Sequence, residues 1–321
     1  MTQTRAADTP GGADRPAGPS TSYGQRLTAV LAERGPLCVG IDPHPRILTG
    51  WGLSTDVSGL ERCARGTVAA LADTVGVFKP QSAFFEAYGS AGIAVLERVL
   101  ADIRAAGALS ILDAKRGDIG STMDAYAAAY LTDGSPLAAD AVTLSPYLGF
   151  GSLQGAIDLA REQGRGVYVL ALTSNPEAPE LQHAVTAGGT SVAQSIVAAA
   201  SACNAGEGPS HSGLNHVGLG HAGLGHAGLG HVGLVVGATV GAAGVRSAGI
   251  DFTGLNGSIL APGIGAQGAT AADLLDVFST ALPLVLPTSS REVLVAGPDP
   301  ESLRRAARRA LGQMEAAAGL G

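Results

Sequence analysis

Eight short apolar runs alternate with longer segments of helical character along this chain, and this alternation restricts the fold more than any other feature. The runs cover residues 37–42, 76–81, 109–115, 141–146, 166–173, 234–239, 258–263 and 283–288. Continuous apolar runs of this length are typical of strands buried on both faces of a parallel sheet. Eight such strands alternating with helices predict an α/β fold, a (β/α)8 TIM barrel. A doubly wound open sheet is the alternative, but no GxGxxG follows the first run.

Two segments do not fit the barrel pattern. Residues 1–20 are rich in Pro, Gly and Asp and have no apolar core, which predicts a disordered tail and not a secretory signal. Residues 205–232 are rich in glycine and histidine. Without these two segments the chain still has about the 250 residues of a typical barrel. We therefore expect one barrel domain over residues 21–321, interrupted by a flexible insertion at about 205–232.

The insertion repeats a histidine every five residues, which raises the hypothesis of a metal-binding tract. The histidines are His211, His216, His221, His226 and His231. A five-residue step places successive side chains about 140° apart on a helix and on opposite faces of a strand. No regular element would gather them, so a neutral low-complexity insertion is favoured. Adventitious binding of Zn²⁺ or Ni²⁺ stays open.

Composition excludes some classes of partner. The formal net charge of −7 argues against a non-specific nucleic-acid binder. No apolar run approaches the roughly 20 residues needed to cross a bilayer. The three cysteines form no CxxC pair and no even set, which favours a reduced, cytoplasmic protein.

Lysine is rare in this chain, and its positions suggest a chemical role. Only two of the 20 basic residues are lysine, Lys79 and Lys115. An arginine side chain keeps its proton in proteins, whereas a lysine can release one when burial or neighbouring charges change its pKa. Proton transfer to a reacting atom therefore favours lysine. The alternative is chance in an arginine-biased composition.

Polar residues follow the predicted strands, at the end of a barrel where catalytic residues are found. They include Asp42, Lys79, Asp113, Lys115, Asp118, Ser174, Gln267 and Arg291. Asp113 and Lys115 are two apart on one strand and so face the same side, and Lys79 on the neighbouring strand can reach them. Alternating cations and carboxylates favour each other's ionised forms. A salt-bridge network that only closes the barrel is the structural alternative.

Together these motifs resemble those of the orotidine 5'-monophosphate decarboxylases. DAKRGDIGST at the third strand resembles the family's D-x-K-x-x-D, and CVGIDPHP and GVFKPQSAFFEAYG resemble its first two strand segments. LTSNPEA, LAPGIGAQG and SSRE resemble its fifth-, seventh- and eighth-strand sites. D-x-K-x-x-D alone is shared with phosphosugar enzymes, but the combination is specific.

The resemblance implies decarboxylation of orotidine 5'-monophosphate to UMP, the last step of pyrimidine nucleotide synthesis, without metal or organic cofactor. It implies that Asp113 lies near the departing carboxylate and that Lys115 stabilises charge at C6 and then protonates it. Lys79 would bridge Asp113 and the ribose. Asp118 would come from the other subunit of a homodimer, with Ile119 and Thr122 beside it.

The same resemblance assigns substrate-binding roles. Asp42 would accept hydrogen bonds from ribose hydroxyls, and Ser174 would meet the pyrimidine edge. Gln267 and Arg291 would hold the phosphate, in agreement with the phosphate site that barrels build from their last two loops. The alternatives are a Mg²⁺-dependent phosphosugar decarboxylase or synthase of the same superfamily, and a metal-binding protein whose function lies in the histidine tract.

Overall fold

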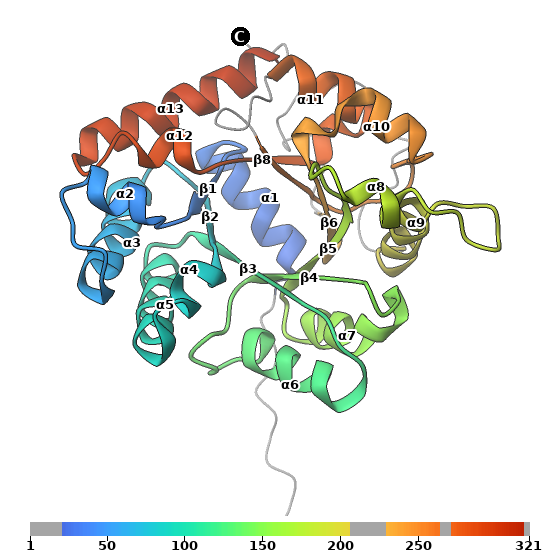
Figure 1. The fold of residues 1–321 in the computed structure, drawn as a ribbon, viewed down its shortest axis with the longest axis horizontal. Coiled ribbons are helices and arrows are strands. Elements are labelled where there is room, and N and C mark those ends of the chain that lie inside the picture. Colours follow the sequence, from blue (N-terminus) through green and yellow to red (C-terminus); the bar gives the residue numbers. More distant parts are fainter. Residues whose placement is uncertain (1–20, 206–228, 264–270, 318–321) are drawn as a thin grey trace, which may run out of the picture.

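A closed barrel of eight parallel strands is the centre of the protein (Figure 1). The computed structural model describes residues 21–205, 229–263 and 271–317. Neighbouring strands pair in sequence order, and β8 pairs with β1 to close the ring. The strands are β1 (Cys38–Ile41), β2 (Val77–Pro80), β3 (Leu109–Arg116), β4 (Ala141–Leu144), β5 (Gly166–Leu172), β6 (Val232–Val236), β7 (Ile259–Pro262) and β8 (Val285–Ser289). Each overlaps its predicted run, so the predicted (β/α)8 barrel is confirmed.

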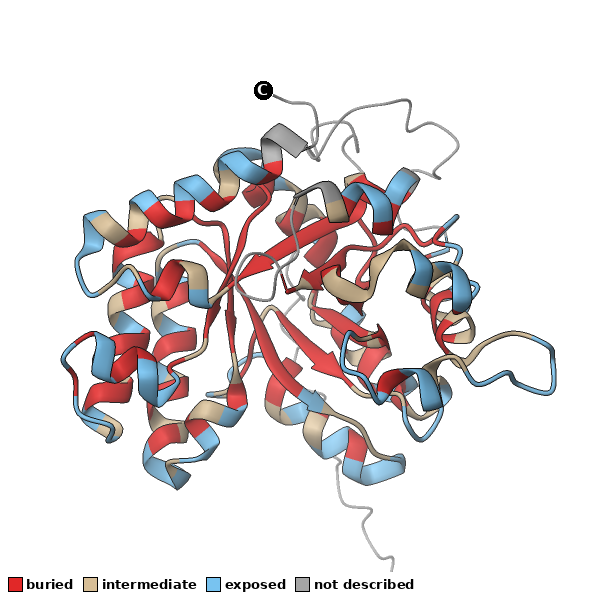
Figure 2. Ribbon diagram, turned by 45° about the horizontal axis from the view of Figure 1, so that its top comes forward, coloured by how far each residue is buried: buried red, intermediate tan, exposed pale blue. Residues whose placement is uncertain are grey.

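Helices surround the strands and present their polar faces outward (Figure 2). The helices in the first half of the chain are α1 (Tyr23–Arg34), α2 (Pro45–Gly50), α3 (Val57–Leu71), α4 (Ser82–Glu86), α5 (Gly89–Ala105), α6 (Gly120–Leu131) and α7 (Gln154–Glu162). Those in the second half are α8 (Ala178–Gln182), α9 (Val192–Cys203), α10 (Gly241–Ser247), α11 (Ala271–Phe278), α12 (Arg291–Leu294) and α13 (Pro300–Ala317). Short 3₁₀ turns cover Phe150–Leu153, Ala238–Val240 and Ser279–Leu284.

Helix α1 closes the end of the barrel at which the strands begin. It starts with a capping box between Ser22 and Gln25, which satisfies backbone donors of its first turn. The Tyr23 hydroxyl lies 2.9 Å from that of Tyr168 on β5, inside the barrel. A side chain at Gly24 would overlap the backbone of Leu229, just before β6. The opposite end of the barrel, where the strands finish, is therefore the open one.

The structure moves one boundary of the predicted insertion. Leu229 and His231 are buried, and β6 begins at Val232, so residues 229–232 belong to the barrel and not to the insertion. The Asn204 side chain, at the end of α9, hydrogen-bonds both the N–H and the carbonyl of Val232. Residues 1–20 and 206–228, with the other four histidines of the tract, lie outside the described residues.

The connection from β6 to β7 is the weakest helical layer, as its glycine-rich sequence predicts. Helix α10 has seven residues and buries none of them. The following loop replaces the missing apolar surface, because Phe252 and Leu255 are buried and the Phe252 ring packs on that of Phe278 in α11. A second side-chain bond from Asn204, to the Leu255 carbonyl, fixes this loop.

Within the described ranges, no helix is both long enough and apolar enough to cross a membrane.

Candidate active site at the open end of the barrel

Four charged side chains meet where β1, β2 and β3 end. Lys79 Nζ lies 3.0 Å from Asp113 Oδ2 and 3.9 Å from Asp42 Oδ1. Lys115 Nζ lies 2.5 Å from the other oxygen of Asp113. The side chains therefore form a row of alternating sign, Asp42–Lys79–Asp113–Lys115, which we call the charge row. Lys79 and Asp113 are almost fully buried, whereas the Lys115 side chain is 44% exposed and faces the open end.

The Asp113 carboxylate is saturated with donors. Oδ2 accepts hydrogen bonds from Lys79 Nζ and from Gln81 Nε2 at 2.9 Å. Oδ1 accepts from Lys115 Nζ and from the Thr143 hydroxyl at 2.9 Å. An ionised carboxylate has about four acceptor positions, two on each oxygen. With four donors around it, the carboxylate is fixed in orientation and held ionised.

Opposite charges in the row shift the pKa values away from their ordinary range. Burial by itself raises the pKa of Asp113, but the ammonium groups of Lys79 and Lys115 outweigh it and hold that pKa well below its usual value. Burial by itself lowers the pKa of Lys79, yet the carboxylates of Asp113 and Asp42 raise it overall. Each buried charge therefore remains ionised because its neighbours have the opposite sign.

Lys115 reaches Asp113 from an unusual backbone conformation. Its φ is +47°, in the left-handed region that residues with a side chain rarely adopt. Simple strand alternation correctly predicts that Asp113 and Lys115 converge. The strand nevertheless ends its regular pairing with β4 before Lys115, since the register shifts between Leu112 and Arg116. Strained backbone of this kind is found preferentially at functional sites.

Asp42 has an oxygen available to a ligand. Its Oδ1 is buried and has no hydrogen-bond partner among the described residues, although Lys79 lies nearby. Gly40, two residues earlier on β1, has the Ser290 hydroxyl directly over it, where a side chain would overlap that oxygen. The ends of β1 and β8 are thus packed closely around this carboxylate.

The structure does not bring Asp118 into the charge row of its own chain. Asp118 Oδ1 accepts a hydrogen bond from the N–H of Ile119, and within the described part of the chain it forms no ion pair. Ile119 is 62% exposed, and Thr122 in the first turns of α6 is also exposed. These three residues lie at the open end but point to solvent in the single chain.

The remaining predicted binding residues follow later strands. Ser174 is exposed after β5 and packs against Gly237, which follows β6. Arg291 is exposed at the start of α12, directly after β8, and forms no ion pair with a described residue. Gln267 lies outside the described residues.

Two polar residues complete the site that the sequence did not single out by role. Gln81 was noted only as a strand-end residue, and Thr143 was not considered at all. Both donate to Asp113. The available signal for Thr143 is a lone polar residue within the apolar run AVTL, a position that is fully buried in the fold.

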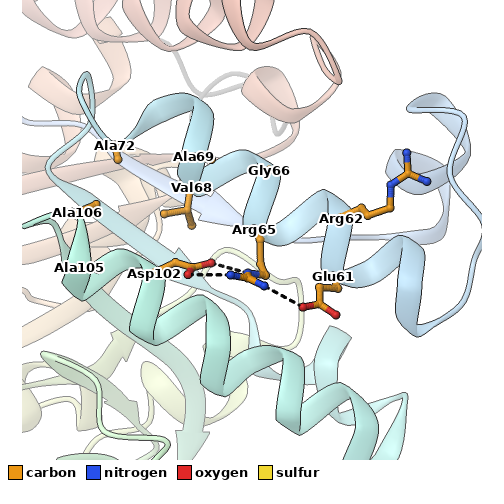
Figure 3. Close-up of a pocket in the computed structure, with 10 residues that line it drawn as sticks. All are labelled: Glu61, Arg62, Arg65, Gly66, Val68, Ala69, Ala72, Asp102, Ala105 and Ala106. Carbon is orange, nitrogen blue, oxygen red and sulfur yellow. Dashed lines mark hydrogen bonds and ion pairs between the residues drawn. The ribbon is translucent and has the colours of Figure 1, made fainter.

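A separate hollow lies outside the barrel, between α3 and α5 (Figure 3). Its charged residues are already paired, because Arg65 binds Asp102 at 2.6 Å and Glu61 at 3.1 Å. Exposed pairs of this type contribute little to stability. None of the predicted site residues lines this hollow, so the open end of the barrel is the candidate active site.

Comparison with known proteins gives a consistent family. Residues 35–306 match the model of the orotidine 5'-phosphate decarboxylase / HUMPS family. The chain is 56% identical to an orotidine 5'-phosphate decarboxylase of Salinispora arenicola over 296 residues, covering 92% of this chain and 98% of that protein. It is 54% identical to one of Streptomyces coelicolor over 287 residues, covering 89% and 95%.

Solved structures agree with the sequence comparison. A protein of Streptomyces avermitilis, crystallised as a candidate orotidine 5'-phosphate decarboxylase, superposes with a TM-score of 0.85 at 52% identity. That superposition covers 96% of this chain and all of the other. The OMP decarboxylase of Leishmania donovani superposes with a TM-score of 0.68 at 28% identity, covering 93% of this chain and all of that one. The chain therefore belongs to the orotidine 5'-phosphate decarboxylase / HUMPS family, as its motifs predict.

Proposed function

We propose that the protein converts orotidine 5'-monophosphate to UMP and CO₂, the last step of pyrimidine nucleotide synthesis. The observation that carries the proposal is the charge row at the open end of the barrel. It presents an ionised carboxylate, Asp113, beside an ammonium group, Lys115, that can deliver a proton. Family membership over nearly the whole chain supports the same reaction. We also propose a cytoplasmic location, because the buried thiols Cys38 and Cys63 suit a reducing compartment.

Decarboxylation leaves an electron pair at C6 of the pyrimidine ring, with no adjacent π-system to delocalise it. In our proposal the C6–carboxylate bond breaks while the Lys115 ammonium stabilises the developing charge, and Lys115 Nζ then gives a proton to C6. Asp113 faces the departing carboxylate and cannot relieve that repulsion by taking a proton, because its pKa is held low. Such a fixed arrangement favours the transition state over the bound substrate.

The other site residues hold the nucleotide in this proposal. Asp42 Oδ1, buried and without a described hydrogen-bond partner, accepts from a ribose hydroxyl, and Lys79 bridges Asp113 and the ribose. Ser174 meets the pyrimidine edge. Arg291 and Gln267 bind the phosphate, where the planar guanidinium can make two parallel hydrogen bonds.

The metal-dependent alternative is less well supported. Sibling enzymes bind Mg²⁺ partly through a carboxylate on the second strand. Here that position is Lys79, whose ammonium lies 3.0 Å from Asp113 and would repel a cation. In residues 21–205, 229–263 and 271–317, no group of three His, Cys, Asp or Glu is placed to hold a metal ion. The charge row itself thus favours a reaction driven by fixed protein charges.

A homodimer is also part of the proposal, with Asp118 completing the charge row of the partner's site. Asp118 forms no ion pair with the described residues of its own chain. Large apolar side chains are exposed around the same end of the barrel, since Ile119 is 62% and Tyr147 is 77% exposed, with Leu148 beside them. An apolar surface next to a carboxylate of this kind fits a contact with a second copy.

Mixing two inactive variants tests the shared site. Lys115→Ala and Asp118→Ala are each expected to be nearly inactive as pure proteins. A mixed dimer has one site with both residues intact, so mixing after dissociation should restore up to about a quarter of the wild-type rate. That figure assumes random reassociation, in which half of the dimers are mixed and one of their two sites is whole. If each variant stays inactive after proven subunit exchange, Asp118 does not act across the interface.

The reaction itself is tested by following the ultraviolet absorbance of orotidine 5'-monophosphate with protein treated with EDTA. We expect rapid conversion to UMP. Inactivity of folded protein until Mg²⁺ and a phosphosugar are supplied would instead establish the metal-dependent alternative.

A second protein without residues 206–228 tests the histidine-tract alternative. The deletion keeps the buried residues 229–232, and it rejoins the chain at the end of the barrel opposite Lys115. We therefore expect unchanged kcat. A large loss of activity in a folded deletion protein would assign the tract a part in function.

A further inference from the structure

The pairing of β3 with β4 is irregular exactly where the charge row is built. Leu112 pairs with Val142, and the next paired residues are Arg116 and Leu144. Three residues of β3, 113–115, therefore face a single residue of β4, Thr143. A bulge of this kind leaves backbone groups without their ladder partners and re-aims side chains, often beside active sites.

Thr143 supplies the missing contacts with its side chain. Its hydroxyl oxygen accepts a hydrogen bond from the backbone N–H of Lys115 at 2.9 Å. The same hydroxyl donates its only proton to Asp113 Oδ1 at 2.9 Å. Thr143 is fully buried, so these two bonds are not exchanged with water. One hydroxyl thus connects the left-handed backbone of Lys115 to the carboxylate that its ammonium group contacts.

This connection fixes a distance that matters for the reaction. Lys115 Nζ and Asp113 Oδ1 both depend on the backbone of the bulge, because the two residues are separated only by Ala114. Strained φ values persist only where the surroundings hold them. The Ser145 hydroxyl bonds the Lys115 carbonyl at 3.2 Å, but it lies in an exposed setting and does not contact Asp113. Thr143 alone bonds both members of the pair among the described residues.

We propose that Thr143 is a positioning residue for the decarboxylation, whose hydroxyl holds Asp113 and the Lys115 backbone in the geometry of the charge row. The inference rests on the proposed function. Both bonds of its hydroxyl are made to the protein, so Thr143 contributes to the chemical step and not to nucleotide binding. Interactions realised in the transition state affect kcat, whereas those that only bind substrate affect KM.

Two substitutions at Thr143 separate its hydroxyl from its packing. Thr143→Val keeps the shape and removes the hydroxyl, and Thr143→Ser keeps the hydroxyl and removes the methyl group. Thr143→Val is expected to lower kcat about 10- to 100-fold, the effect typical of losing a hydrogen bond to a charged group. KM and the affinity for UMP should stay within about twofold. Thr143→Ser should retain kcat within about threefold.

Thr67→Val is the matched control. Thr67 is equally buried, and its hydroxyl bonds the Cys63 carbonyl within α3, away from the site. Its substitution should leave kcat unchanged. Thermal unfolding of each variant verifies that it is folded, and a crystal structure of Thr143→Val should show Asp113 or the Lys115 backbone displaced.

The outcomes distinguish failure of the inference from failure of the function. Wild type without decarboxylase activity would overturn the proposed function and the role of Thr143 with it. An active wild type with a Thr143→Val variant of unchanged kcat would overturn only the positioning role. Equal losses in Thr143→Val and Thr143→Ser, or losses matched by Thr67→Val, would assign the effect to packing and overturn it as well.

Discussion

Lys115→Ala is expected to lower kcat for decarboxylation by about 10⁴-fold or more. The substitution removes a proton donor, a contribution of about 10²–10⁴, and a fixed cation at the developing charge, about 10²–10³. Folding should be little affected, because the Lys115 side chain is 44% exposed. Single-turnover absorbance measurements at saturating substrate would give kcat without interference from binding.

Lys115→Arg is the informative companion to the alanine variant. Arginine keeps the positive charge but does not release a proton in proteins. We expect its kcat to be close to that of Lys115→Ala. An arginine variant that retained more than a tenth of wild-type kcat would show that charge alone suffices and that the proton comes from elsewhere.

Asp113→Asn is expected to reduce the free energy of unfolding by about 3–5 kcal/mol, the usual cost of leaving a buried charge without its partner. Lys79 is that charge, since it is 4% exposed and lies 3.0 Å from Asp113. The double variant Lys79→Met/Asp113→Asn should recover much of the loss. Glu61→Gln, which breaks an exposed pair with Arg98, should cost no more than about 1 kcal/mol. Urea unfolding at pH 7 measures all three.

The loss in Asp113→Asn should depend on pH in a direction that the pKa shifts fix. The pKa of Asp113 is lower in the folded protein than its unfolded value of about 3.9. Its stabilising contribution is therefore complete above about pH 4 and is lost as the pH falls toward the folded pKa. The pKa of Lys79 is raised, so its contribution is complete below about pH 10.4 and is lost at higher pH.

The free-energy difference between wild type and Asp113→Asn should consequently be largest near neutral pH and shrink below about pH 4. Urea unfolding at pH 7, 4 and 3 would reveal this change. A difference that stayed constant over this range would mean that the charge of Asp113 does not stabilise the fold. A difference that increased in acid would contradict the sign of its pKa shift.

Much of the fold followed from local patterns. Strands buried on both faces are continuously apolar, so the eight runs were visible in the sequence and each overlaps a strand. Helix α1 was not predicted, although Ser22 and Gln25 carry a capping-box spacing. The insertion was bounded too late, because its repeat continues into residues 229–232, and glycine and histidine there do not reveal that the backbone already packs against α1.

The sequence by itself determined the barrel and the rim on which the polar residues gather, because parallel strands end on the same side and side chains alternate along them. It also determined that Lys79, Asp113 and Lys115 would meet, and the structure brings them within hydrogen-bonding distance. Only the tertiary structure decided how they are held. The four donors on Asp113, the left-handed Lys115 and the role of Thr143 depend on a register shift between β3 and β4. Register is a relation between two strands distant in the chain, set by the packing of the closed barrel, and no local pattern encodes it.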